Sequence, residues 1–171
     1  ILITGGAGYV GSACLRYVAE QGHDVMAYDS LVMGHEQAMD GHAFVEGDIA
    51  DTALLTQTLK DFGADAVMHF AAATYVGESV ENPEYYYRNN VSGTLSLLNA
   101  MRAAGVNRLL FSSTCATYGE QDGVLLDETS PQRPTNAYGA SKRAVEEIIA
   151  HMAAAPGADL SHVFFRYFNV A

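Results

Sequence analysis

The sequence is poor in cysteine, since its 171 residues include only Cys14 and Cys115. Two cysteines so far apart in the chain indicate neither a disulfide framework nor a zinc site. The six histidines show no metal-ligand spacing, so no metal site is predicted. A reducing, cytoplasmic compartment fits this composition best.

Basic residues and long apolar runs are also scarce. Nine Lys and Arg residues against twenty Asp and Glu give a net charge of −11, which argues against nucleic acid or an anionic membrane as the main partner. The sequence shows no run of eighteen apolar residues and no charged-then-apolar leader, so neither a membrane span nor a signal peptide is expected. The 171 residues, 49% of them hydrophobic, suffice for one full-sized globular domain.

Residues 1–11 read ILITGGAGYVG and predict a strand, a glycine-rich turn and the start of a helix. Gly6, Gly8 and Gly11 satisfy GxGxxG, and Gly5 extends the pattern to GxxGxxG. Glycines allow a tight turn, close approach of the backbone to a pyrophosphate, and close packing of the helix on its strand. The helix N-terminus adds unpaired N–H groups for the phosphates. The stretch therefore predicts a dinucleotide-binding turn, although an ordinary glycine-rich turn has the same pattern.

Asp29 follows the second expected strand, residues 24–28, and lies 18 positions beyond Gly11. An acidic residue about 20 positions after the glycines receives the ribose hydroxyls of a dinucleotide. Because a carboxylate accepts hydrogen bonds from a 2′-OH and repels a 2′-phosphate, NAD is favoured over NADP. The alternative is that Asp29 caps a turn in the loop over residues 29–41.

Strand and helix patterns alternate along the chain without an internal repeat or a low-complexity linker. Strands are expected at 1–4, 24–28, 43–46, 66–70, 107–111 and 161–166, and helices at 9–21, 52–62, 83–104 and 136–154. Such alternation predicts a doubly wound α/β fold, a parallel sheet with helices on both faces and ligands at the carboxyl ends of the strands. We expect residues 1–171 to form one dinucleotide-binding domain, with a smaller C-terminal substrate domain largely absent from this chain.

Tyr138 and Lys142 lie four residues apart on an expected helix, so their side chains share one face. The pKa of a phenol, near 10, is too high for a base at neutral pH, and a nearby ammonium favours the phenolate. The pair therefore predicts an acid/base whose pKa is brought towards the operating pH. A surface tyrosine packed on a lysine stem is the alternative, but the glycine turn upstream and the hydroxyl cluster at 112–114 favour catalysis.

Taken together, the motifs resemble the extended short-chain dehydrogenases/reductases, and within them the UDP-glucose 4-epimerase group. The matching segments, in the family's order, are TGGAGYVGS, HFAAATYVGES, NNVSGT, FSSTCATYG, YGASK and RYFN. The resemblance covers essentially the whole chain. It implies a Rossmann fold, NAD as cofactor, a UDP-sugar as substrate, and a homodimer whose interface uses the helix over 83–104 and the helix that carries YxxxK.

Carried over position by position, the resemblance implies a long set of NAD contacts. They are Gly5, Gly8, Tyr9, Val10, Gly11, Asp29, Ser30, Leu31, Gly34, Asp48, Ile49, Phe70, Ala71, Ala72, Thr74, Asn89, Ser112, Tyr138, Lys142 and Phe168. Tyr138, Lys142 and Thr114 are the implied catalytic residues, and Thr114, Tyr138 and Asn169 the implied substrate contacts. Thr114 stands where the family usually has serine. It keeps the hydroxyl that can bridge a sugar 4-OH to Tyr138, while its methyl group could narrow the site.

The implied activity is 4-epimerisation of a UDP-sugar, most typically UDP-glucose and UDP-galactose, by transient oxidation at C4 and reduction on the other face. Sugar-nucleotide 4,6-dehydratases and the related decarboxylases share the fold and the YxxxK pair. Those enzymes carry an acidic residue directly after the active-site hydroxyl, where this sequence has Cys115 and Ala116. A catalytically silent NAD-binding module is a further alternative, against which the retention of Tyr138, Lys142 and Thr114 argues.

Three other features are expected to be structural. His69 ends a buried strand and is interpreted as a core histidine with satisfied hydrogen bonds rather than a base. Tyr85, Tyr86 and Tyr87 are interpreted as packing residues on the long helix, and Tyr118 as a support for the loop after the fifth strand.

Overall fold

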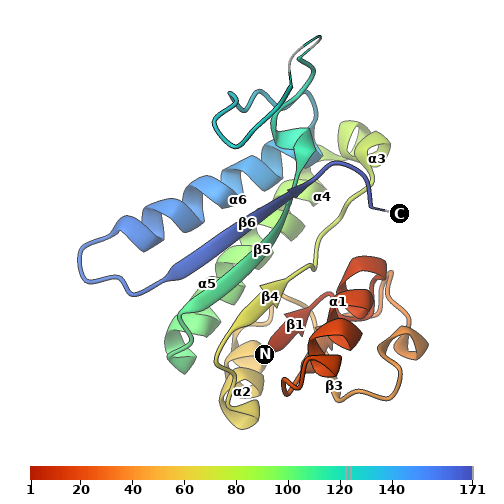
Figure 1. Ribbon diagram of the computed structural model, residues 1–171, viewed down its shortest axis with the longest axis vertical. Coiled ribbons are helices and arrows are strands. Elements are labelled where there is room, and N and C mark those ends of the chain that lie inside the picture. The colour runs from red at the N-terminus through yellow and green to blue at the C-terminus, as the bar shows by residue number, and fades with distance from the viewer. Residues whose placement is uncertain (122, 124, 171) are drawn as a thin grey trace.

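The computed structural model describes residues 1–121, 123 and 125–170, and its centre is one parallel sheet (Figure 1). The sheet has six strands in the order β3-β2-β1-β4-β5-β6, and all of its neighbours pair in parallel. The strands are β1 (Leu2–Thr4), β2 (Met26–Asp29), β3 (Phe44–Glu46), β4 (Val67–His69), β5 (Arg108–Thr114) and β6 (Ser161–Tyr167). The strand order reverses direction between β1 and β4, which is the doubly wound Rossmann arrangement that the sequence predicts.

Helices cover both faces of this sheet. The longer ones are α1 (Tyr9–Glu20), α2 (Thr52–Phe62), α5 (Gly93–Ala104) and α6 (Ala137–Ala154), and the short ones are α3 (Val76–Glu81) and α4 (Pro83–Tyr86). Residues of α2, α5 and α6 share one apolar core with the sheet, whereas α1 packs into a second core on the opposite face. The chain therefore builds a three-layer sandwich with α1 alone among the longer helices on its side.

The alternation of side chains along the strands explains why both faces carry a core. Leu2 belongs to the core under α2, α5 and α6, while the next residue, Ile3, belongs to the core under α1. Tyr28 and Ala27 divide between the two faces in the same way. All four side chains are fully buried. Because successive side chains of a strand point to opposite faces, a central parallel strand covered on both faces carries apolar side chains at consecutive positions.

The helix expected over residues 83–104 is not continuous. It consists of α4, a π-helical segment (Tyr87–Ser92) and α5. Asn90 lies in the π-helical segment, and its buried side chain hydrogen-bonds the backbone of Ala73. A π-helical turn inserts one residue into the helical repeat, and here it lies where Asn90 reaches the neighbouring loop.

Three short helical segments lie where only loops were expected. The helix α3 follows β4, one 3₁₀ turn (Glu36–Met39) lies in the loop after β2, and another (Cys115–Thr117) follows β5. The helix α3 has six residues, includes Gly77 and buries only Ser79, so its sequence carries almost no apolar periodicity from which a helix could be predicted.

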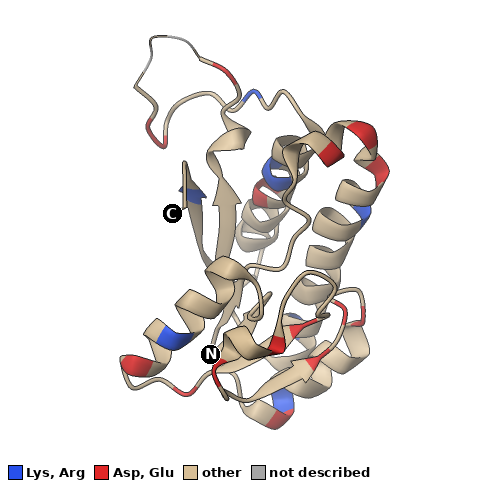
Figure 2. Cartoon of the chain, turned by 90° about the vertical axis from the view of Figure 1, so that its right-hand side faces the viewer, with Lys and Arg blue, Asp and Glu red and all other residues tan. Residues whose placement is uncertain are grey.

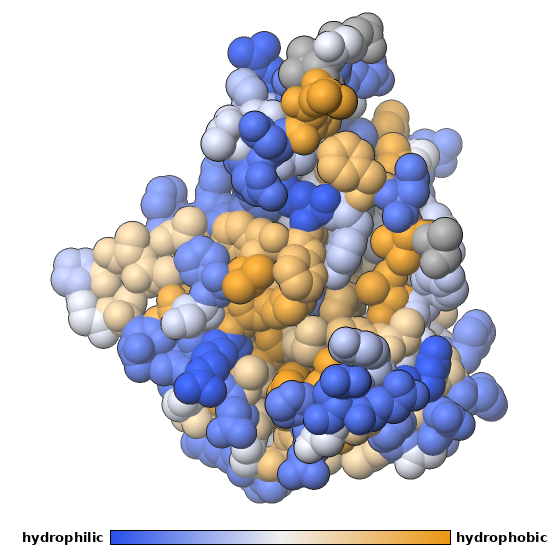
Figure 3. All heavy atoms as spheres, in the orientation of Figure 1, coloured by the Kyte–Doolittle hydropathy of each residue, from blue (hydrophilic) through white to orange (hydrophobic). Residues whose placement is uncertain are grey.

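Strand β6 is less covered than the other strands. Val163 is 52% exposed and Phe165 is 42% exposed, and apolar atoms gather where β6 crosses the front of the molecule (Figure 3). Charged residues, in contrast, are spread over the outer helices, strand ends and loops (Figure 2). Within the described residues, the helices are all too short or too polar to span a lipid bilayer.

Candidate functional site

The carboxyl ends of the strands open into a groove made of two adjoining hollows, about 350 Å³ and about 410 Å³ in volume. The two hollows share lining residues from the glycine turn (Gly5 and Gly8), from the loop after β2 (Met33) and from the segment after β4 (Phe70 and Ala72). Larger hollows of about 490 Å³ and 690 Å³ lie elsewhere, one between the ends of α5 and α6 and one along β6. The groove is where a doubly wound sheet binds its ligands.

The glycine turn at the end of β1 is packed so closely that side chains are excluded. A Cβ on Gly11 would lie 2.1 Å from the carbonyl oxygen of Gly5. Gly5 itself has φ +72°, and its Cβ would lie 2.5 Å from the backbone nitrogen of Ala71. The turn thus presents bare backbone to the groove at the N-terminus of α1, as an anion such as a pyrophosphate requires.

Asp29 at the end of β2 lines the first hollow and also holds the glycine turn. Its Oδ2 accepts a hydrogen bond from the backbone N–H of Ala7 at 3.0 Å, and its Oδ1 accepts one from Leu31 at 2.9 Å. The position on the groove agrees with the predicted ribose contact, and the bond to Leu31 is the turn cap that was the alternative. Leu31 takes part through its backbone, in a left-handed conformation with φ 57°.

The segment after β4 forms the floor between the two hollows and is held by a residue that sequence reasoning missed. Asn90 is 2% exposed. Its Oδ1 accepts from the N–H of Ala73 at 2.8 Å, and its Nδ2 donates to the Ala73 carbonyl at 3.0 Å and to Ser141 Oγ at 3.1 Å. Asn89, a predicted NAD contact, donates to Asn90 Oδ1 at 2.9 Å. The available signal was an asparagine inside an otherwise helical pattern, where it is unfavourable without a specific partner.

His69 is a buried histidine whose two ring nitrogens are both satisfied. Nδ1 lies 2.6 Å from Thr4 Oγ1, and Nε2 lies 2.9 Å from Thr94 Oγ1. Because the Thr94 hydroxyl donates to the carbonyl of Asn90, the ring donates from Nε2 and accepts at Nδ1. Burial lowers the pKa of His69 to about 3, and the positive charge of Lys142 adds to this effect. The interpretation of His69 as a core histidine is confirmed.

Tyr138 and Thr114 meet at the second hollow, and both line it. Thr114 is the last residue of β5, and Tyr138 lies in the first turn of α6 because Asn136 caps that helix by accepting the N–H of Gly139 at 2.8 Å. Burial raises the pKa of the Tyr138 phenol, while its hydrogen bond with Thr114 acts in the opposite direction.

Lys142 lies one helical turn beyond Tyr138 and is only 2% exposed. Its Nζ donates to the carbonyl oxygen of Ser112 at 2.9 Å and lies 4.7 Å from the centroid of the Phe111 ring. Burial lowers the pKa of Lys142 to about 7, and the charge of Glu146 counteracts part of that fall.

The pKa shift expected for Tyr138 differs from the one that the structure shows. An ammonium on the same helix face was expected to lower the pKa of the phenol, whereas burial raises it. The physical reason is that desolvation penalises the phenolate more than its hydrogen bond stabilises it, while Lys142 is directed to Ser112.

Most of the residues predicted to contact NAD or substrate line the groove. They are Gly5, Gly8, Tyr9, Val10, Gly11, Asp29, Ser30, Gly34, Asp48, Ile49, Phe70, Ala71, Ala72, Thr74, Asn89, Ser112, Thr114, Tyr138 and Phe168. Lys142 lies buried behind this lining, and Asn169 is exposed beyond Phe168. Their contacts with cofactor or substrate stay predictions.

Several lining residues were not predicted: Gly47, Tyr75, Tyr85, Ser113 and Tyr167. Tyr85 was interpreted as a packing residue, but its side chain is only partly buried and faces the first hollow. The fully buried tyrosine of that run is Tyr86, whose ring packs edge-on against Tyr138 at 6.5 Å between centroids. Tyr118 is buried behind the loop after β5, so its interpretation as a support is confirmed.

Comparisons with known proteins match the chain over its whole length. The model of the NAD dependent epimerase/dehydratase family matches residues 1–171. The UDP-glucose 4-epimerase of Corynebacterium glutamicum is 49% identical over all of this chain and 51% of its own length, and that of Streptomyces lividans is 49% identical over 99% and 52%. The chain thus spans about half the length of the curated relatives it matches.

Solved structures show the same likeness. The UDP-glucose 4-epimerase of Brucella ovis in complex with NAD is 47% identical with a TM-score of 0.94, covering 98% of this chain and 51% of that one. A dTDP-glucose 4,6-dehydratase from Streptomyces venezuelae, solved with NAD, is 32% identical with a TM-score of 0.87, covering 95% and 54%.

Proposed function

The chain belongs to the NAD-dependent epimerase/dehydratase family, and on that premise we propose that the full-length protein is a UDP-sugar 4-epimerase with NAD as its cofactor. The observation that carries the proposal is the meeting of Thr114 and Tyr138 at one end of a groove that runs past the glycine turn to Asp29. UDP-glucose and UDP-galactose are the substrates we favour, because relatives at 44–49% identity are named UDP-glucose 4-epimerases.

The residues present fit NAD. The glycine turn leaves no room for a Cβ at Gly5 or Gly11 and so keeps its backbone close to the groove, and the Asp29 carboxylate lies on the hollow that Gly5 and Gly8 also line, where it would receive ribose hydroxyls. We assign the pyrophosphate to the glycine turn, the adenosine to the side of Asp29, Asp48 and Ile49, and the nicotinamide to the side of Tyr138. NAD supplies, when bound, a ring that takes up a hydride from a sugar carbon and gives it back.

The chain itself supplies the proton chemistry. Tyr138, as phenolate, takes the proton of the sugar C4 hydroxyl, and it returns this proton when C4 is reduced on its other face. The Thr114 hydroxyl bridges the phenol oxygen and the sugar C4 oxygen. Burial raises the pKa of the Tyr138 phenol and its hydrogen bond with Thr114 opposes that rise, and the positive charge of a nicotinamide ring bound beside the phenol would favour the phenolate further.

A 4,6-dehydratase is the second candidate, favoured by the likeness to the Streptomyces venezuelae enzyme. Elimination of water needs further acid/base groups beside the active-site hydroxyl, and Thr114 is followed by Cys115 and Ala116. A silent NAD-binding module is the third, but it would not need Tyr138 and Thr114 on the groove. We therefore rank epimerisation first.

The remaining assignments concern the whole protein. We infer that residues 1–171 form the NAD-binding domain with Tyr138 and Lys142, and that a smaller substrate domain holds the UDP group. We also infer a homodimer that packs α5 and α6 against a second copy, because Tyr87 and Leu95 expose apolar side chains on that side of the fold. The free thiols of Cys14 and Cys115 fit a cytoplasmic location.

The test is to give the full-length protein UDP-glucose, UDP-galactose, UDP-xylose and UDP-N-acetylglucosamine without added NAD and to follow the anomeric protons by NMR. Interconversion of a C4 pair supports the epimerase and identifies its sugar. Loss of the C6 hydroxyl with formation of a 4-keto sugar would favour the dehydratase. Unchanged sugars in the presence of demonstrably bound NAD would favour the silent module.

A further inference from the structure

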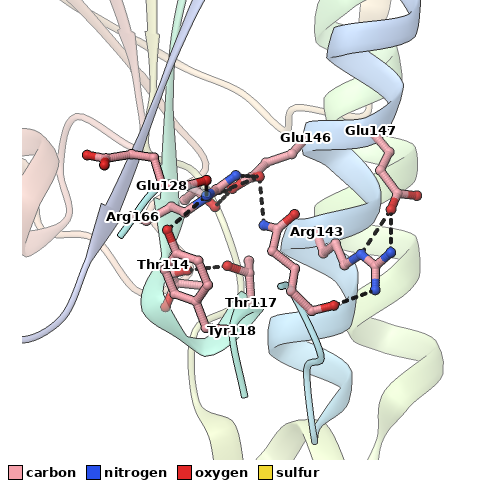
Figure 4. Close-up of polar contacts among 10 residues, drawn as sticks. Thr114, Thr117, Tyr118, Glu128, Arg143, Glu146, Glu147 and Arg166 are labelled. Atoms are coloured by element: carbon pink, nitrogen blue, oxygen red, sulfur yellow. Dashed lines mark hydrogen bonds and ion pairs between the residues drawn. The ribbon is translucent and has the colours of Figure 1, made fainter. Parts of the chain in front are cut away.

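The face of the sheet under α6 holds a buried carboxylate that the proposed chemistry does not use. Glu146 is 3% exposed and lies over Ser113 of β5 and Arg166 of β6, which are partners in the register of the two strands. Arg166 Nη2 donates to Glu146 Oε2 at 2.7 Å and Nε donates to Oε1 at 3.0 Å. The Ser113 hydroxyl and the amide of Gln132 donate to the same carboxylate. Figure 4 shows the side chains of Glu146 and Arg166 directed toward one another.

Arg166 is itself held from the other side. Its Nη1 donates to the Tyr118 hydroxyl at 2.8 Å and to the Glu128 carbonyl at 3.4 Å, and the guanidinium lies 5.1 Å from the centroid of the Tyr118 ring. A buried ion pair is weak evidence for stability, because desolvation of two charges can exceed their attraction. The role of the Glu146–Arg166 pair therefore follows from its position beside Thr114 and Lys142.

Glu146 lies one helical turn beyond Lys142 on α6, and its partner Ser113 directly precedes Thr114 on β5. Lys142 bonds the carbonyl of Ser112 and Glu146 bonds the hydroxyl of Ser113, so α6 grips two successive residues of β5 directly before Thr114. We propose that Glu146, held by Arg166, is a positioning residue that keeps Lys142 positively charged and fixes the end of β5 that carries Thr114. The inference rests on the proposed function, in which Thr114 and Tyr138 are the groups beside the reacting sugar.

The charges around Lys142 support this role. The ionisable groups that surround it are Tyr138 and Glu146 on α6, His69 on β4, and Arg166 on β6, which is bonded to Glu146. His69 is neutral, because burial holds its pKa at about 3. Glu146 is thus the carboxylate that opposes the desolvation of Lys142. Without its charge, Lys142 would share the buried space with an uncompensated guanidinium, and the ammonium would lose its proton more readily.

The experiment compares Glu146→Gln with Glu147→Gln in the full-length protein. Both changes remove one negative charge from α6, but Glu147 lies on the outer face, where it pairs with Arg143 at 2.9 Å and keeps a side chain that is 54% exposed. The pKa of Lys142 is measured by NMR titration of ¹³Cε-labelled lysines, with the signal assigned by its loss in Lys142→Arg. The other lysine of this chain, Lys60, is exposed and serves as a reference.

We expect the pKa of Lys142 to fall by about one unit in Glu146→Gln and to stay unchanged in Glu147→Gln. The alkaline limb of the pH profile of kcat should move to lower pH by a similar amount. Ser113→Ala removes the hydrogen bond between β5 and Glu146 and keeps the negative charge of Glu146. It should lower kcat without shifting the alkaline limb of the pH profile. An unchanged Lys142 pKa in folded Glu146→Gln would overturn the proposal.

A double variant and a readout that is independent of activity keep the test decisive. If Glu146→Gln does not fold, Glu146→Gln combined with Arg166→Leu removes both charges, and we expect a smaller fall of the Lys142 pKa in the same direction, with no fall counting against the proposal. If the wild-type protein epimerises none of the sugars, the proposed function fails. The NMR titration still decides whether Glu146 sets the charge of Lys142.

Discussion

The wall of the groove is built by opposite means at the end of β1 and at the end of β5. At the end of β1, the wall is bare backbone, and the absence of side chains at Gly5 and Gly11 lets the turn close upon itself. At the end of β5, the wall is made of polar side chains, with Tyr138 at the surface and Lys142 and Glu146 buried behind it. The end of β1 therefore depends on missing side chains at Gly5 and Gly11, and the end of β5 depends on the polar groups that its side chains supply.

The contacts that hold the ends of β1 and β5 also differ in the sequence separation of the residues that they join. Gly8 donates to the carbonyl of Gly5, and Asp29 bonds the N–H of Leu31 two residues away and that of Ala7 22 residues away. Lys142 and Glu146 bond residues of β5 that lie 30 and 33 positions away. The glycines that mark the end of β1 thus lie within one short segment, although Asp29 and Ala71 pack on them, whereas the residues at the end of β5 come together only once α6 has packed on the sheet.

The largest effect is expected from adding one methyl group at the end of β1. In Gly11→Ala, the new Cβ would meet the Gly5 carbonyl at 2.1 Å, so the turn must open, at a cost of about 1–3 kcal/mol or more in the free energy of unfolding. Bound NAD should be lost with the cradle, and activity with it. Urea unfolding and the NAD content of the purified full-length protein are the measurements.

Gly77→Ala is the matched control, because an added Cβ there meets nothing within 4 Å in the short helix α3. Alanine is favoured over glycine in a helix by about 0.5–1 kcal/mol, so this variant should keep its NAD and be as stable as the wild type or more so. If Gly11→Ala retained NAD as well as Gly77→Ala does, the glycine turn would not be the cradle.

The difference in sequence separation explains which residues of the site could be predicted from the sequence. The glycine turn and Asp29 are recognisable because their pattern and spacing are local, and YxxxK because both members lie on one helical turn. Asn90, Glu146 and Arg166 could not be found in this way. Asn90 and Glu146 are buried and Arg166 is half-buried, on faces that periodicity alone would fill with apolar side chains, and each is satisfied by partners distant in the sequence. The same holds for the π-helical segment, which follows from the place of Asn90 rather than from helix propensity.

The second prediction removes one atom at the end of β5. Tyr138→Phe keeps the ring that packs edge-on against Tyr86 and loses the hydroxyl, so the fold and the bound NAD should remain. We expect kcat to fall by about 10²–10⁴-fold, the usual contribution of a positioned acid/base. Steady-state kinetics with the sugar identified by NMR measures it, and a loss below tenfold would mean that another group moves the proton.

The third prediction concerns His69, which lies on β4 between β1 and β5. Its pKa is about 3 in the folded chain against about 6.5 when unfolded. The unfolded state therefore binds the proton first, so the contribution of neutral His69 is fully present above pH 6.5 and is lost as the pH falls towards 3. The slope is about 1.4 kcal/mol per pH unit within that window.

Urea unfolding at a series of pH values between 4 and 8 measures this slope. His69→Gln, which cannot titrate, should reduce it, whereas His151→Gln, at an exposed position on α6, should leave it unchanged. An equal slope in the wild type and in His69→Gln would assign the acid sensitivity to other groups.

The smallest effect is expected from removing the methyl group of Thr114. Its side-chain oxygen accepts the N–H of Ala116 at 3.2 Å and bonds Tyr138, and a serine can make both contacts. Because the side chain is 8% exposed and ends the strand, Thr114→Ser should change kcat by less than about threefold, under 1 kcal/mol. Thr114→Val keeps the shape and loses the oxygen, so it should lower kcat by at least tenfold, the price of one charge-assisted hydrogen bond. Equal losses in the two variants would mean that the methyl group packs the end of β5 and that the hydroxyl does not bridge to the sugar.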